Sequence, residues 1–264
     1  MNDTAIDDPF MQLALMGEKP SPSHQNLSTA TSRERGTLHL IGGEKGGVGK
    51  SLMARLLVHY MQERLLPFCA FDADRSNADL MRYYPEVSTQ ILTDQHDHMD
   101  KIIEAAHQNP GRRIVVDLAA QTHDLLVKWM EEVDMIEMVR EMGIRVFYWH
   151  VMDCGKDSVD LLQKLFDRFG SKLNYVIVQN QFRGEKFDLF EKSAQRQRAA
   201  ELKASFISIR HLMDHVMHKI DSSDAQFAVG KHPERDNTGL GLVDRQRLKI
   251  WLTQACAQID RIEI

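Results

Sequence analysis

The 264-residue chain has little cysteine, no long apolar run and no excess of positive charge. Its three cysteines, Cys69, Cys154 and Cys256, are far apart and fit neither a disulfide framework nor a CxxC metal pair. No apolar run approaches the roughly 20 residues needed to cross a bilayer, and the first residues, MNDTAIDDPF, are acidic where a secretory leader is basic. These absences exclude secreted and integral membrane classes, and we expect a cytoplasmic protein.

The charge balance gives the chain no general attraction to nucleic acid. The 33 Lys and Arg residues stand against 38 Asp and Glu, for a formal charge of −5. Proteins that bind DNA without sequence preference neutralise its phosphates with Lys and Arg, so net charge does not support DNA binding here. Such binding would need a local basic patch. The available candidates are Arg196, Arg198, Lys203 and Arg210.

Composition divides the chain into two parts. Residues 1–36 predict a flexible N-terminal tail, because their prolines, serines and threonines offer too little apolar surface to offset the entropy of ordering. Residues 37–264 alternate short apolar runs with helical periodicity, which predicts one α/β domain, a doubly wound and mostly parallel sheet with helices on both faces. The predicted strands are 37–42, 68–72, 113–119, 145–152, 173–180 and 205–209.

The segment GGEKGGVGKS at residues 42–51 follows a predicted strand and precedes a predicted helix. Its glycines let backbone N–H groups turn inward around a phosphate, and the helix N-terminus adds its positive dipole. The lysine at 50 would reach the β- and γ-phosphates, and the hydroxyl at 51 would bind Mg²⁺. Glu44 breaks the strict GxxxxGK[ST] pattern, so the match is to the deviant form KGGxGK[ST]. The expected nucleotide-binding residues of this loop are Gly46, Gly47, Val48, Gly49, Lys50, Ser51 and Leu52.

Carboxylates end two further predicted strands, on the side of an open parallel sheet where ligands bind. Asp72 and Asp74 end the second strand, and Asp117 follows Ile114-Val115-Val116 as in a Walker B strand. Asp72 would hold a water of the Mg²⁺ shell, Asp74 would orient the attacking water, and Asp117 would join the outer shell of the metal.

Two further patterns have a functional and an ordinary interpretation. Asn180 closes the strand LNYVIVQN, where its amide would either read the edge of adenine or form a simple turn. His211, His215 and His218 have a spacing that would put three imidazoles on one helical face. We interpret that face as an exposed, histidine-rich helix, because no carboxylate or cysteine stands at ligand spacing to support a zinc site.

With these motifs in place, residues 37–260 resemble the MinD/ParA group of P-loop ATPases. Within that group, the phrases FDADRSNADLMRYYP and YWHVMDCGKDSVDLLQKLFDRFG are similar to the TraL/MobD type of plasmid conjugal transfer and mobilization proteins. The resemblance implies a sandwich dimer that forms with ATP, in which Lys45 reaches the nucleotide of the partner, and which hydrolysis releases. Arg75-Ser76 departs from the usual Pro-Gln of the chromosome-partition members, which puts a shared partner-stimulated switch in doubt.

We therefore expect a Mg²⁺-dependent ATPase, slow and stimulated by a protein partner, that assists plasmid transfer or mobilization as an ATP-dependent homodimer. Catalysis would depend on Lys45 and Lys50 for charge and on Asp74 for the water. The main alternative is a ParA-like partition or positioning ATPase that binds DNA non-specifically. There are two further alternatives. One is a ligase or synthetase that acts on a small substrate with a carboxylate, and the other is a scaffold that binds nucleotide without useful turnover.

Overall fold

The computed structural model describes residues 36–43, 45–75, 77–109, 111–232 and 237–264. Except for Gly36, the predicted N-terminal tail lies outside these residues, as does Glu44 of the loop motif and Ser76 after the second strand. The predicted boundary between the tail and the domain therefore stays a prediction.

The described residues form a seven-stranded sheet in the order β3-β2-β4-β1-β5-β6-β7, and every pair of neighbouring strands is parallel. Parallel pairing needs a crossover between successive strands, and the helices provide these crossovers. The expected doubly wound, parallel α/β fold is confirmed. The strands are β1 (Thr37–Gly42), β2 (Phe68–Asp72), β3 (Ser88–Gln90), β4 (Arg113–Asp117), β5 (Arg145–Met152), β6 (Asn174–Asn180) and β7 (Ser205–Ile209).

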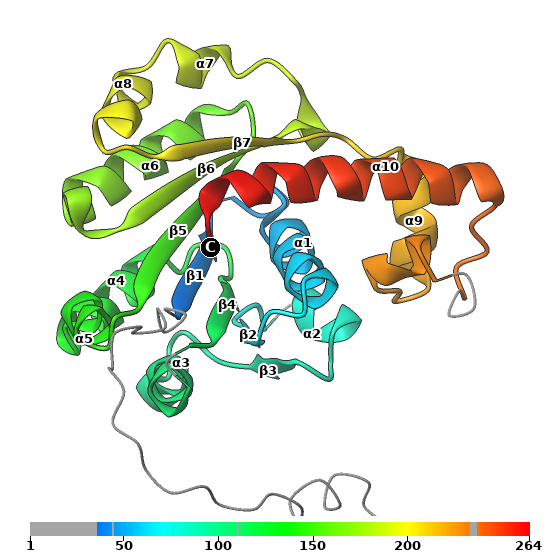
Figure 1. Ribbon diagram of the computed structural model, residues 1–264. Coiled ribbons are helices and arrows are strands. Elements are labelled where there is room, and N and C mark those ends of the chain that lie inside the picture. The colour runs from blue at the N-terminus through cyan, green and yellow to red at the C-terminus, as the bar shows by residue number, and fades with distance from the viewer. Residues whose placement is uncertain (1–35, 44, 76, 110, 233–236) are drawn as a thin grey trace, which may run out of the picture. The chain divides into compact units, whose positions relative to one another are not determined.

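Helices cover both faces of this sheet (Figure 1). One face packs against α1 (Lys50–Glu63), α2 (Asp79–Tyr83), α9 (Asp214–Ser222) and α10 (Leu242–Ile259). The other face packs against α3 (His96–Gln108), α4 (His123–Glu132), α5 (Met135–Glu141), α6 (Lys156–Phe169), α7 (Asp188–Glu191) and α8 (Ala194–Glu201). No helix in the described part of the chain has both the length and the apolar character that a membrane span requires.

Two buried clusters fill the space between the sheet and its helices. Successive side chains of a strand point to opposite faces, so a central strand supplies both clusters. In β5, Val146 and Tyr148 pack toward α6, whereas Phe147 and Trp149 pack toward α1 and α10. Strands buried on both sides read as nearly continuous apolar runs, and this is the pattern that made them recognisable in the sequence.

The strand predictions differ from the structure at short or terminal segments. The edge strand β3 was not predicted, because its three residues, Ser88–Gln90, carry no apolar run. The strand predicted at 113–119 ends at Asp117, and the last helix spans Leu242–Ile259 against a predicted 243–261. The predicted apolar face of that last helix is buried throughout, at Leu248, Trp251, Leu252, Ala255 and Ile259.

Candidate nucleotide-binding site

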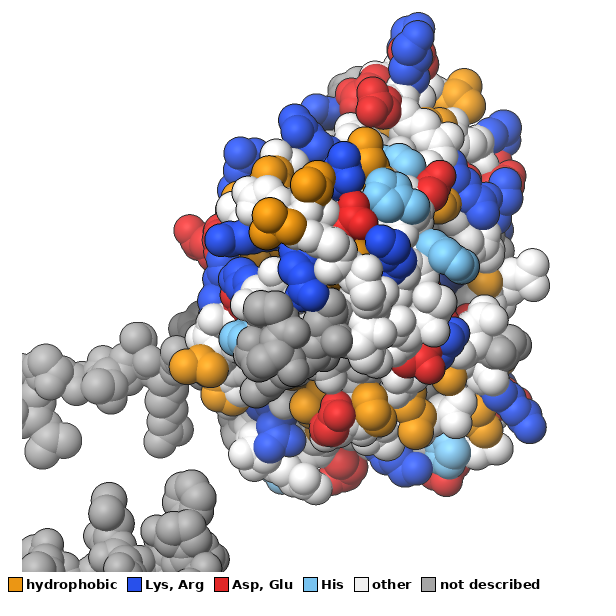
Figure 2. Space-filling view, turned by 90° about the vertical axis from the view of Figure 1, so that its right-hand side faces the viewer, with side chains coloured by type: hydrophobic (Ala, Val, Ile, Leu, Met, Phe, Trp, Pro, Cys, Tyr) orange, Lys and Arg blue, Asp and Glu red, His pale blue; other side chains and the backbone are white. Residues whose placement is uncertain are grey.

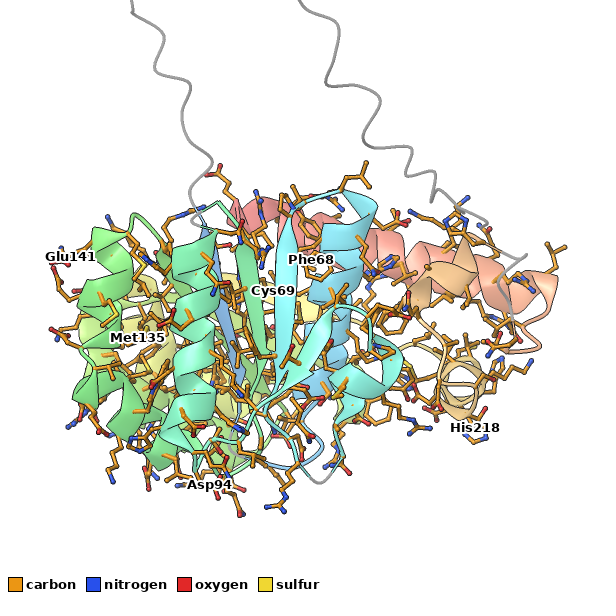
Figure 3. All side chains as sticks on the ribbon, turned by 90° about the horizontal axis from the view of Figure 1, so that it is seen from below. Phe68, Cys69, Asp94, Met135, Glu141 and His218 are labelled. Atoms are coloured by element: carbon orange, nitrogen blue, oxygen red, sulfur yellow. The ribbon has the colours of Figure 1, made fainter. Side chains whose placement is uncertain are left out.

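A pocket of about 690 Å³ opens at the carboxyl ends of the strands. Figure 3 shows both ends of the strands. Phe68, the first residue of β2, lies at the amino ends, and Asp94, which lines the pocket, lies at the opposite, carboxyl ends. Open parallel sheets bind their ligands at the carboxyl ends of the strands. The phosphate-loop motif, the segment after β2, the segment after β4 and the end of β6 all line the pocket, so the fold brings together motifs that lie far apart in the sequence.

The loop between β1 and α1 has the backbone that a phosphate-binding turn requires. Gly47 and Gly49 have φ values of +76° and +101°, a backbone region that residues with a Cβ rarely adopt. Gly49 also caps α1, whose first residue is Lys50. The helix N-terminus with its positive dipole therefore faces the loop, as anion binding requires.

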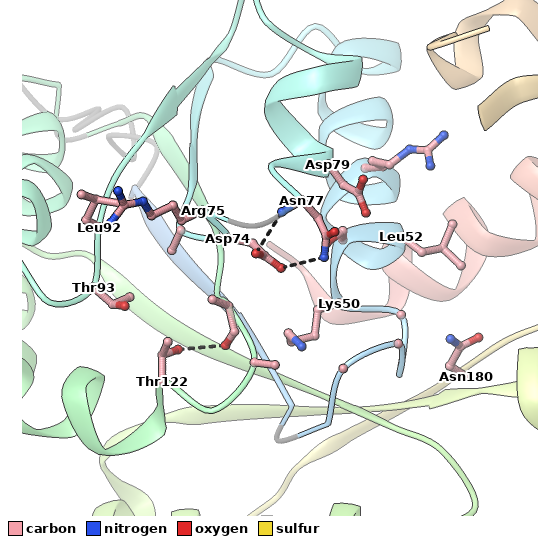
Figure 4. A pocket seen from close by; sticks show the side chains of 18 of the residues that line it. Lys50, Leu52, Asp74, Arg75, Asn77, Asp79, Leu92, Thr93, Thr122 and Asn180 are labelled. Atoms are coloured by element: carbon pink, nitrogen blue, oxygen red, sulfur yellow. Dashed lines mark hydrogen bonds between the residues drawn. The ribbon is translucent and has the colours of Figure 1, made fainter. Parts of the chain in front are cut away.

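The two lysines of the motif have different surroundings. Lys50 is 7% exposed, and its Nζ donates a hydrogen bond to the backbone oxygen of Lys45 at 3.3 Å. Lys45 itself is exposed at the surface of the loop. Figure 4 shows the Lys50 side chain at the centre of the pocket. Its ammonium is therefore positioned for an anion in the loop, whereas the Lys45 side chain is available to a group outside the protein.

Asp72 and Asp117 lie on neighbouring strands in direct register. Both are fully buried. Asp72 accepts hydrogen bonds from the backbone N–H groups of Asp74 (2.9 Å) and Met81 (3.0 Å), whereas neither oxygen of Asp117 has a hydrogen-bond partner among the described residues. Burial and the nearby Asp72 charge raise the pKa of Asp117 well above its usual value, against the opposing effects of Ser51 and Lys50. Among the described residues, both Asp117 oxygens thus lie beside the Ser51 hydroxyl and the Lys50 ammonium without a hydrogen bond to either.

The residues present fit a hydrated Mg²⁺ ion. The described residues contain no group of three or more His, Cys, Asp and Glu side chains that would ligate a metal directly. Mg²⁺ usually keeps several waters and is bound by one or two carboxylates together with substrate phosphates. The unpartnered oxygens of Asp117, beside Asp72 and Ser51, are the oxygen donors that such an ion and its waters require.

Asp74 lies on the wall of the pocket between the loop and α2. Its carboxylate accepts hydrogen bonds from the backbone N–H of Asn77 at 3.2 Å and from the Asn77 side chain at 3.5 Å (Figure 4). The neighbouring Arg75 is exposed and also lines the pocket. The carboxylate is therefore held at the pocket wall by its own turn, and its predicted role in orienting water stays a prediction.

Asn180 contacts the phosphate-binding loop directly. Its Nδ2 donates to the backbone oxygen of Val48 at 2.7 Å, and its Oδ1 accepts from the backbone N–H of Phe182 at 3.3 Å. A Cβ at Gly49 would lie 2.2 Å from this Nδ2, so glycine is required at that position for the close approach. The amide connects the end of β6 to the loop, and its predicted contact with adenine stays a prediction.

The prediction that His211, His215 and His218 share one helical face is wrong. The helix α9 begins at Asp214, so His211 precedes it. The segment between β7 and α9 is held by tertiary contacts, since the Trp251 Nε1 donates to the Arg210 oxygen at 2.6 Å. Acidic, basic and histidine side chains are interspersed on this side of the protein, where α9 meets the start of α10 (Figure 2).

Two histidines of this segment have carboxylate partners that the sequence spacing did not indicate. His211 lies 2.8 Å from the Asp214 carboxylate, and His215 lies 3.0 Å from that of Asp244. Asp244 also pairs with Lys219, which links α9 to α10, and with Arg247 within α10. These contacts give the histidines a structural role.

The basic patch considered for DNA is partly neutralised. Arg196 pairs with Glu191 at 3.2 Å, and Arg198 pairs with Asp167. Ion-paired arginines attract DNA phosphates less than unpaired ones, because the neighbouring carboxylate cancels part of their field. The structure therefore adds no support for a DNA-binding surface there.

Sequence reasoning missed several residues that line the pocket. Phe182 follows Asn180 by two residues. An aromatic residue so soon after the predicted strand end was the available signal for a pocket-lining side chain. Arg55 lies one helical turn after Ser51, and its guanidinium pairs with Asp221 at 2.9 Å. The two residues are 166 positions apart, so this contact has no local signal in the sequence. The other missed lining residues are Asn77, Asp79, Leu92, Thr93, Asp94, Ala119, Ala120, Thr122, Leu125 and Met217.

The chain is similar in sequence to a known protein. The chain is 28% identical over 224 residues to protein MobD from Acidithiobacillus ferrooxidans, which covers 83% of this chain and 94% of that protein. A search against models of known protein families finds no match.

Solved structures similar to this chain include a nucleotide-binding protein from Archaeoglobus fulgidus in complex with ADP, at a TM-score of 0.44 and 16% identity over 71% of this chain and 86% of that one. They also include the MinC:MinD cell division complex of Aquifex aeolicus, at a TM-score of 0.46 and 12% identity over 82% of this chain and 95% of that one. The similarity to MobD confirms the resemblance to the MobD type, and the phosphate-binding loop on an all-parallel sheet gives this chain the architecture of a P-loop NTPase.

Proposed function

We propose that this protein is a Mg²⁺-dependent ATPase that acts as a molecular switch, dimerises with ATP and assists plasmid conjugal transfer or mobilization. The observation that carries the proposal is the buried Lys50 at the start of α1, near a buried carboxylate, Asp117, whose two oxygens have no hydrogen-bond partner among the described residues. A magnesium nucleotide would supply phosphates for the ammonium to bind and a hydrated cation for the carboxylate.

The protein groups divide the reaction between them. Loop N–H groups and Lys50 would hold the β- and γ-phosphates, while Ser51, Asp72 and Asp117 would hold the ion and its waters. When bound, Mg²⁺ neutralises charge on the phosphates. Asp74 would orient a water toward the γ-phosphate, and this water would displace ADP and yield phosphate. Phosphoryl transfer needs mainly positioning and charge stabilisation, which these residues are suited to provide.

The similarity to MobD supports the role in plasmid mobilization, which the sequence resemblance already implied. We further propose a protein partner from the mobilization machinery as the stimulus for hydrolysis. Lys45 supports the proposed dimer, because its side chain is exposed on the loop while its backbone oxygen contacts Lys50.

Lys50→Ala tests the proposal. A ligand at about 100 times its Kd stabilises a protein by roughly 2.7 kcal/mol, which for a domain of this size raises Tm by about 5–10 °C. We expect Mg·ATP to produce this shift in the wild type and in the control Lys101→Ala, an exposed lysine of α3, but not in Lys50→Ala.

Plasmid mobilization frequency is the second measurement on the same variants. We expect Lys50→Ala to reduce transfer at least about tenfold, because a switch that binds no nucleotide cannot cycle. Equal thermal shifts in all three proteins would contradict the nucleotide site. Normal transfer by a Lys50→Ala protein that binds no ATP would contradict the mobilization role alone.

A further inference from the structure

An exposed aromatic ring lies on the wall of the candidate nucleotide pocket. Phe182 belongs to the short 3-10 turn Gln181–Arg183 that follows β6, and it is 47% exposed. Its side chain lines the same pocket as the loop residues Gly49 and Lys50. Covering a large, exposed apolar side chain with a flat ligand removes apolar surface from water and so favours binding.

The ring has a fixed relation to the phosphate-binding loop. Asn180 donates to the Val48 oxygen at 2.7 Å and accepts from the Phe182 N–H at 3.3 Å, so a single side chain, itself 6% exposed, joins the loop to the backbone of Phe182. A second contact comes from Arg183, whose guanidinium lies 2.6 Å from the position that a Cβ on Gly47 would take. The turn that carries Phe182 is thus bonded to the loop through Asn180 and lies close to it at Gly47.

The segment after β7 supports the ring from another direction. His211 packs edge-on against Phe182, with ring centroids 5.2 Å apart and an angle of 69° between the rings. The His211 imidazole is in turn held by the Asp214 carboxylate at 2.8 Å. A ring whose backbone is hydrogen-bonded and whose side chain packs on a second ring loses little side-chain entropy when a ligand stacks on it.

Apolar side chains other than Phe182 also line the pocket. Leu52 and Met217 line it together with Phe182. Figure 4 shows Leu52 and Asn180 on the same side of Lys50, away from Thr93 and Thr122. The pocket therefore combines a polar region for phosphates with an apolar region that carries an aromatic ring.

We propose that Phe182 is the surface on which the base of the nucleotide stacks. This inference rests on the proposed nucleotide binding and names a residue that determines how the base is held. Asn180 fixes the position of the platform through the loop, and His211 supports the ring. Every nucleobase has a π-face, so stacking contributes to the binding of adenine and guanine nucleotides alike.

Nucleotide affinity measured on Phe182 variants tests the proposal. Base–aromatic stacking typically changes affinity by roughly 5- to 150-fold on substitution with alanine. We expect Phe182→Ala to weaken Mg·ATP and Mg·GTP by similar factors of at least about fivefold, and to leave the affinity for inorganic tripolyphosphate unchanged. Phe182→Trp should retain wild-type affinity, while Phe182→Leu, which is apolar but not aromatic, should lose it.

Leu189→Ala is the matched control, because Leu189 is an exposed apolar residue of α7 that does not line the pocket. Circular dichroism of each variant checks that it is folded. Unchanged ATP affinity in Phe182→Ala, wild-type affinity in Phe182→Leu, or an equal loss for tripolyphosphate would overturn the stacking role. A wild type that binds none of the three ligands would instead overturn the proposed function.

Discussion

Asp117 is a buried carboxylate whose ionised form lowers the stability of the folded protein. Its carboxylate is fully buried, neither oxygen has a partner in the described part of the chain, and the strand register places Asp72 directly beside it. Burying an unpartnered carboxylate costs free energy, and the raised pKa of Asp117 expresses that cost. A folded-state pKa above the unfolded value means that this group destabilises the protein increasingly as the pH rises above its usual range.

We predict that Asp117→Asn raises the Tm of the nucleotide-free protein and reduces the additional shift caused by Mg·ATP. Removing the buried charge should stabilise the protein by about 1 kcal/mol or more, or about 2–4 °C in Tm. Thermal unfolding with and without Mg·ATP measures both effects. Asp97→Asn, at an exposed position in α3, is the control and should leave the ligand-induced shift unchanged. A lower Tm in the nucleotide-free Asp117→Asn protein would contradict the cost assigned to this carboxylate.

Among the elements, α10 packs against α1, the helix that begins at the candidate nucleotide site. It packs against α1 and the sheet through Leu248, Trp251 and Leu252, and its opposite side carries the 48% exposed Ile250. Most helical stability in proteins comes from packing one face, so the effect of a substitution depends on which face it changes.

We predict that Trp251→Ala destabilises the protein by about 3–5 kcal/mol, because it leaves a cavity and removes the hydrogen bond to the Arg210 oxygen. Ile250→Ala, one position earlier on the exposed side, should cost less than about 1 kcal/mol. Urea unfolding of the two variants provides the measurement. Similar losses in both would mean that α10 is not packed through the face described.

For the molecule as a whole, the proposed switch separates assembly from chemistry. The exposed Lys45 side chain extends from a loop that Lys50 stabilises from inside, whereas Asp74 lies on the pocket wall. Loss of the Lys45 side chain should weaken contact with a second copy of the chain. Loss of the Asp74 carboxylate should impair the positioning of the attacking water.

We predict that Lys45→Ala binds ATP but fails to dimerise, and that Asp74→Ala forms dimers that accumulate in ATP. Sedimentation velocity with ATP, ADP and a non-hydrolysable analogue measures both. The wild type should dimerise with ATP and the analogue and dissociate in ADP, and Lys101→Ala should behave in the same way. A wild type that stays monomeric with all three nucleotides, or a Lys45→Ala protein that dimerises normally, would refute the dimer mechanism.

We expect three buried histidines of the described residues to lower the stability of the fold in acid. Burial lowers the pKa of His39 to about 3 and the pKa values of His59 and His150 to about 4, from 6.5. The unfolded chain therefore binds more protons than the folded protein between pH 6.5 and about 4, and stability is lost as the pH falls through this range. The raised pKa values of Asp72 and Asp117 oppose this trend.

We predict that His59→Leu reduces the loss of stability between pH 7 and pH 5 by about 2 kcal/mol. Both ring nitrogens of His59 lack hydrogen-bond partners among the described residues, so the substitution removes no contact of that kind. Urea unfolding at the two pH values measures the difference, and the exposed His107→Leu serves as control. An unchanged pH dependence in His59→Leu would show that His59 does not contribute to the acid sensitivity.

The sequence by itself determined the central strands, the loop before α1 and the face of α10, because apolar periodicity and glycine spacing are local properties of the chain. The three-residue edge strand β3 and the start of α9 at Asp214 depended on tertiary contacts that no local pattern encodes. The same holds within the site. The motifs predicted Asp117 and Asn180, but only strand pairing and burial decided that one carboxylate would lack a partner and that the amide would join the loop to Phe182, since such contacts exist only after the strands have assembled.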